Sequence, residues 1–132
     1  MFLQIDLPWL LDIAHQELPG DPEVVDWGSL EAARARHGFR VLDTPVYDQA
    51  HHRAGALLQQ LVRVPALEHS NELYGAVVAA AYLSASGFTV SVTTKEAIEL
   101  VEQAAAGRVD VRQIASSLKE WTRTPDDHGG GG

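Results

Sequence analysis

The stretch that decides the fold is residues 70–87, SNELYGAVVAAAYLSASG. Its middle, residues 76–81, is made entirely of alanine and valine. A helix that is apolar on every side is buried among other elements, and small side chains let those neighbours approach closely. We therefore predict a buried central helix over residues 71–86, capped by the Ser70 side chain and ended by Gly87.

The segments on either side of this stretch also carry helix signals. Asp6 stands at an N-cap position ahead of an apolar periodic run, and Thr93 with Glu96 has the spacing of a capping box. Asp110 and Gln113 make a looser version of the same box. The further expected helices cover residues 7–18, 29–37, 48–64, 94–106 and 111–121.

These helices predict an all-α fold of about six helices around a buried central one. The length of 132 residues favours one domain, which we place over residues 1–121. Strand content is expected to be at most a short hairpin or flap near residues 24–28 or 39–46. The Gly-rich segment 122–132 is expected to be a disordered tail.

Composition restricts the chemistry and the partners. The chain has no cysteine, which excludes disulfides, thiolate metal sites and a cysteine nucleophile. Its formal charge of −8 repels nucleic acid and anionic lipid and favours a cationic partner, although plain solubility explains the same charge. Without a long apolar run or a basic leader, we expect a cytoplasmic protein that does not enter a membrane.

Five phrases, taken in order, resemble one family. They are LLDIAHQEL (10–18), VVDWGSLEAARAR (24–36), HHRAGALLQQLVRVPAL (51–67), AAAYLSASGFTV (79–90) and AAAGRVDVRQIASSLKEW (104–121). Their order and spacing resemble the Fic/Doc family, specifically the short Doc (death-on-curing) proteins, over roughly residues 3–121. The resemblance implies a helical bundle whose 24–36 segment forms a target-binding flap and the helix after it.

The chain departs from that family in the motif that carries its chemistry. The family motif, HPFxDGNKR, supplies a general-base His, a Gly and an Asn that bind phosphate, and a Lys and an Arg that neutralise charge. Here the aligned residues 65–73 read PALEHSNEL, with only Asn71 retained. Pro65 stands in place of the His, Glu72 in place of the Lys and Leu73 in place of the Arg.

This replacement argues against nucleotide chemistry. Transfer of a phosphoryl or nucleotidyl group needs cations around the transferred phosphate. A Glu72 carboxylate in the first helical turn repels phosphate, and Pro65 cannot accept a proton. We therefore expect neither AMPylation nor phosphorylation, and no cofactor.

A polar site for an amine or ammonium group is the functional reading of what remains. We predict Glu68 and His15 as catalytic proton-transfer residues. The substrate-binding residues are predicted to be Trp27, His69, Asn71, Glu72 and Tyr74. The structural alternative is that Glu72 only complements the helix dipole and Glu68 is solvated.

No metal site is expected. Asp48 could share a ligand set with His51 or His52, but two ligands do not make a good site.

Three functions stay open. The first is a repurposed enzyme acting on a Lys-bearing peptide, similar in size and class to the proteins that form the lysinoalanine bridge of cinnamycin- and duramycin-type lanthipeptides. The second is a catalytically dead Doc-like protein that binds an antitoxin-like or regulatory partner. The third is a toxin with altered chemistry, disfavoured by the lost cations. The partner is thus a peptide or small protein, and a homodimer is compatible with a partly open apolar groove.

Overall fold

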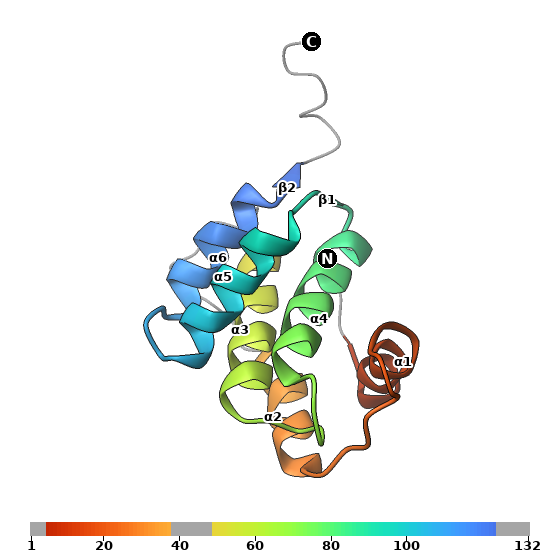
Figure 1. Ribbon diagram of the computed structural model, residues 1–132. Helices are drawn as coiled ribbons and strands as arrows, with labels where there is room; N and C mark the ends of the chain where they lie inside the picture. The colour runs from red at the N-terminus through yellow and green to blue at the C-terminus, as the bar shows by residue number, and fades with distance from the viewer. Residues whose placement is uncertain (1–4, 38–48, 124–132) are drawn as a thin grey trace.

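A computed structural model describes residues 5–37 and 49–123 (Figure 1). Within these residues the chain forms six helices and one two-stranded sheet, so the all-α prediction is confirmed. The elements are α1 (Leu7–Glu17), α2 (Trp27–His37), α3 (Gln49–Arg63), α4 (Asn71–Ala85), β1 (Thr89–Val90), α5 (Thr94–Ala105), α6 (Val111–Glu120) and β2 (Thr122–Arg123). None of these helices is long and apolar enough to cross a membrane.

Helix α3 shares the centre of the bundle with α4. It packs against α2, α4, α5 and α6, whereas α4 packs against α1, α3, α5 and β1 (Figure 1). The prediction that residues 71–86 would be covered all round is therefore wrong on one side. Leu73 is 44% exposed and Val77 is only half-buried, because α5 does not close over that side of α4.

The start signals for three helices form as expected. Asp6 accepts a hydrogen bond from the Trp9 amide at 3.0 Å. Thr93 and Asp110 each form a complete capping box with the residue three positions later. Each box satisfies donors that the first helical turn would otherwise leave unpaired, so it fixes where α5 and α6 begin.

Two other boundaries differ from the predictions. Helix α2 begins at Trp27 rather than Ser29, because the Asp26 carboxylate accepts from the Ser29 amide at 3.0 Å and so acts as the cap. Ser70 precedes α4 as expected, but it adopts a left-handed φ of 65° and its side chain makes no capping hydrogen bond. The predicted stop at Gly38 lies outside the described residues.

The sheet also differs from the prediction. Thr122 and Arg123 were assigned to a disordered tail, yet they pair antiparallel with Val90 and Thr89. Of the two predicted flap positions, residues 39–46 lie outside the described residues. The other, 24–28, contributes a single bridge from Val24 to Leu67 before α2 begins.

Helices α3 and α4 approach each other closely at Gly75. A Cβ at this position would stand 2.8 Å from Val62 Cγ1 and 3.3 Å from the Leu58 carbonyl oxygen. A distance of 2.8 Å is shorter than carbon atoms tolerate, so a larger residue forces the helices apart.

Gly75→Ala is expected to destabilise the fold. The better helix propensity of alanine contributes about 1 kcal/mol, but overpacking costs about 1–3 kcal/mol, so we expect a net loss of up to about 2 kcal/mol. Urea unfolding followed by circular dichroism measures this change. Gly28→Ala in the exposed start of α2 is the control: its Cβ would meet only the Asp26 carboxylate, at 3.2 Å, so we expect a neutral effect or a gain of up to about 1 kcal/mol. Equal effects at both positions would show that Gly75 is not a packing constraint.

Candidate functional site

The loop between α3 and α4 is held against the segment that precedes α2. The Val25 amide donates to the Ala66 carbonyl at 2.7 Å, and the Glu68 amide donates to the Glu23 carbonyl at 2.9 Å. The Glu68 carboxylate closes the pairing by accepting from the Glu23 amide at 3.1 Å. This loop is therefore braced on the segment that precedes α2.

Asn71 organises the same loop from inside. Its Oδ1 accepts from the amides of Ala66 and Leu67 at 3.1 and 3.0 Å, and its Nδ2 donates to the Leu67 carbonyl at 3.0 Å. These three bonds use both ends of the side-chain amide. Asn71, predicted to bind substrate, thus has a structural role here.

Tyr74 has a structural partner as well. It is fully buried, and its hydroxyl donates to the Leu10 carbonyl at 2.7 Å, which ties α4 to α1. Burial raises the pKa of this phenol well above its ordinary value, because the charged form loses its hydration. A group held neutral in the core is unsuited to contact a substrate directly.

The turn after α1 brings His15 into contact with Asp21, an acid that the sequence analysis did not predict as a site residue. His15 Nδ1 lies 2.5 Å from Asp21 Oδ1, and both side chains are exposed. The contact depends on the turn after α1, where Gly20 and Asp21 both have positive φ angles of 76° and 45°. The sequence PGDP at residues 19–22 is typical of a turn, and it is the sequence feature that could have indicated this contact.

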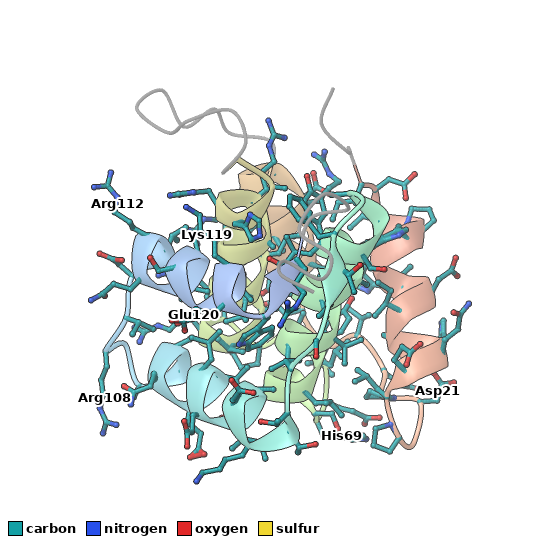
Figure 2. The ribbon with its side chains drawn as sticks, turned by 90° about the horizontal axis from the view of Figure 1, so that it is seen from above. Asp21, His69, Arg108, Arg112, Lys119 and Glu120 are labelled. Atoms are coloured by element: carbon teal, nitrogen blue, oxygen red, sulfur yellow. The ribbon has the colours of Figure 1, made fainter. Side chains whose placement is uncertain are left out.

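His69 lies beside the same turn. A Cβ built at Gly20 would be 3.4 Å from the His69 ring, so the ring packs on the glycine next to Asp21. Figure 2 shows Asp21 and His69 at one edge of the molecule. His69 Nδ1 also lies 2.8 Å from the Ser70 hydroxyl. His15, Asp21 and His69 thus form an exposed polar cluster around the turn.

The two predicted catalytic residues have different partners within this region. His15 bonds Asp21, whereas the Glu68 carboxylate bonds the Glu23 amide. Trp27, predicted to contact a ligand, is the first residue of α2 and is 55% exposed.

Glu72 lies at a different feature, a groove between α4 and α5. The groove has a volume of ≈ 520 Å³. The sequence predicts a partly open apolar groove but does not locate it, because an apolar helix face looks the same whether it is covered or open. The lining residues are Glu72, Leu73, Ala76, Val77, Ala80, Val92, Thr93, Thr94, Ala97, Ile98, Val101 and Trp121.

Metal-binding residues do not gather in the part of the chain that the structure describes, where no group of three or more His, Asp or Glu side chains could hold an ion. Asp48 lies outside it.

His51 is buried, with Nε2 2.8 Å from the Thr122 hydroxyl and its ring edge-on to Phe88. Since Thr122 gives its one hydroxyl proton to the Lys119 carbonyl, His51 must donate to Thr122.

Neither models of known protein families nor the curated proteins contain a match to this chain.

Replacement of Asn71 should loosen the braced loop. Asn71→Ala removes three hydrogen bonds and leaves two partly buried amides without an acceptor, which should cost about 2–3 kcal/mol. Asn71→Asp keeps the acceptors and should cost less. Urea unfolding gives the stability, and hydrogen exchange at Ala66 and Leu67 reports the loop itself. An Asn71→Ala protein with unchanged stability and exchange would contradict the structural role.

Proposed function

We propose that this chain binds an apolar peptide segment carrying Lys or Arg side chains, and that the segment lies in the groove between α4 and α5. The observation that carries the proposal is the groove itself, whose volume of ≈ 520 Å³ falls in the range of ligand sites. Its lining is apolar apart from Glu72 and two threonines. This corresponds to a Doc-like scaffold that has kept a binding role without nucleotide chemistry.

The shape of the groove suits a short segment of chain. Its α4 wall runs from Glu72 to Ala80, about 12 Å at the rise of an α-helix. Leu73 and Ile98 stand 44% and 48% exposed on the two walls. Covering each of them would contribute about 1 kcal/mol to binding, so a partner with facing apolar side chains gains from both walls.

Charge selects the partner. Glu72 is the one carboxylate in the groove lining, and α5 adds a general negative potential from Glu96 and Glu99, which line a hollow on another side of that helix. A segment with Lys or Arg beside its apolar residues is therefore attracted. A second copy of this chain would bring the same carboxylates to the same place, which disfavours self-association through the groove.

Ile98→Glu should reduce binding of a fluorescently labelled Leu/Lys amphipathic peptide of about four helical turns, measured by fluorescence anisotropy. The substitution removes an apolar contact and places a charge in the groove, so we expect at least a tenfold weaker Kd. Glu72→Gln should weaken binding less and reduce its salt dependence. The matched control is Val25→Glu, because Val25 is 64% exposed but does not line the groove.

Three outcomes would contradict this assignment. The wild-type chain could ignore the peptide at low salt, Val25→Glu could weaken binding as much as Ile98→Glu, or sedimentation could show a dimer that Ile98→Glu dissociates. The last result would assign the groove to a second copy.

A second candidate function rests on the His15–Asp21 pair. A histidine held by a carboxylate is an arrangement that accepts protons, and lysinoalanine formation requires that step. The Lys Nζ adds to the β-carbon of dehydroalanine, the N–C bond forms as the C=C π bond breaks, and a proton leaves nitrogen while another reaches the α-carbon. The reaction requires neither metal nor nucleotide.

If this second function holds, His15→Ala and Glu68→Gln should lower turnover about 100-fold while the urea midpoint changes little. The assay incubates the full chain with a dehydrated, cyclised lanthipeptide that bears Lys and dehydroalanine. Since the bridge is mass-neutral, it is detected as lost trypsin cleavage at that Lys and lost thiol addition. Glu17→Gln, an exposed acid on α1, is the control. No bridge with the wild-type chain, or parallel losses of turnover and stability, would end this candidate.

A further inference from the structure

A second hollow, with the opposite charge, lies where α2, the end of α3 and the α5–α6 connection meet. Its volume is ≈ 490 Å³, and it shares no lining residue with the α4–α5 groove. Three of its lining residues are Arg36, Arg63 and Arg108, and we call it the arginine hollow.

Each arginine comes from a different element and two are held in place. Arg36 on α2 donates to Gln59 Oε1 at 2.8 Å and to Gln60 Oε1 at 3.3 Å. Arg63 on α3 donates to the Ala105 carbonyl at 3.4 Å. These bonds use two of the five N–H donors of Arg36 and one of those of Arg63, so both guanidinium groups keep donors for a ligand.

The chain makes room for Arg63 at a specific glycine. Gly107 has a φ of 75°, and a Cβ at this position would overlap the Arg63 guanidinium. The left-handed conformation favours glycine here, and the absence of a Cβ leaves the space that the end of the flexible Arg63 side chain occupies. The turn after α5 is thus compatible with this position of Arg63.

The positive charge in the hollow is not neutralised by the described residues. No carboxylate of residues 5–37 or 49–123 lies within 4 Å of these three guanidinium groups. The one acid in the lining, Asp110, accepts from the Gln113 amide at 2.8 Å as the cap of α6. In a chain with a formal charge of −8, three cations facing one engaged carboxylate is an unusual local excess.

We propose that the arginine hollow binds a small oxyanion with at least two negative charges, a phosphate ester or a polycarboxylate. Arg36 and Arg63 supply the planar forks that match such oxygens in pairs, and Arg108 stands at the rim. The first amides of α6, which begins at the hollow, add positive potential. The anion relieves the repulsion among the three guanidinium groups.

Isothermal titration of the full chain with inorganic pyrophosphate tests the site. One pyrophosphate should bind per chain, with affinity falling as salt rises. Arg63→Gln and Arg108→Gln should each weaken binding about tenfold, since each removes charge-assisted hydrogen bonds. Arg112→Gln is the matched control, because Arg112 is exposed on α6, does not line the hollow and points away from Arg108 (Figure 2).

The outcomes separate clearly. The proposal is overturned if neither pyrophosphate nor citrate at millimolar concentration gives binding heat. It is also overturned if Arg112→Gln weakens binding as much as the other variants, because the anion would then respond to diffuse surface charge. Tighter binding of pyrophosphate than of citrate assigns a phosphate ligand, and the reverse assigns a polycarboxylate. Far-UV circular dichroism checks each variant. If Arg63→Gln unfolds, exposed Arg108 still decides the question.

Discussion

The close approach of α3 and α4 at Gly75 is the constraint on which the rest of the structure depends. It lets the two helices share the centre, with Val62 and Leu58 lying where a larger residue would have its side chain. The other helices are arranged on this pair: α2, α5 and α6 pack on α3, and α1 reaches α4 through Tyr74. The apolar surface of α4 is covered by α1, α3 and β1 but only in part by α5.

The other side of α4 explains why a groove exists at all. Small residues let α3 come near, but they do not project far enough to fill the space between α4 and α5. Val77 and Ala80 therefore remain half-buried while Leu73 and Ile98 stay partly exposed. This uncovered apolar surface of α4 is the basis of the proposed peptide site.

The features that sequence predicted well are those decided within one turn of helix. Both capping boxes form because donor and acceptor are three residues apart. The features that the sequence did not predict depend on contacts between residues far apart in the chain or on the conformation of turns. Whether Asn71 faces a ligand or its own loop depends on how residues 65–68 fold back, and no helical periodicity reports that.

The same limit applies to the histidines and to the end of the helical region. Asp21 reaches His15 only because two successive residues take positive φ. Thr122 joins a strand because β1 lies beside it and His51 donates to its hydroxyl. These contacts arise from tertiary structure, which overrides the local signals of polar, turn-rich segments.

The distribution of charge, rather than its total, separates the two hollows. A net charge of −8 argues by itself only for solubility and against nucleic acid. The fold concentrates carboxylates along α5 and gathers Arg36, Arg63 and Arg108 at the α5–α6 connection. Because exposed charges act over roughly 10 Å, each hollow responds to its own lining more than to the average. An acidic chain can therefore attract a cationic segment at one face and an anion at another.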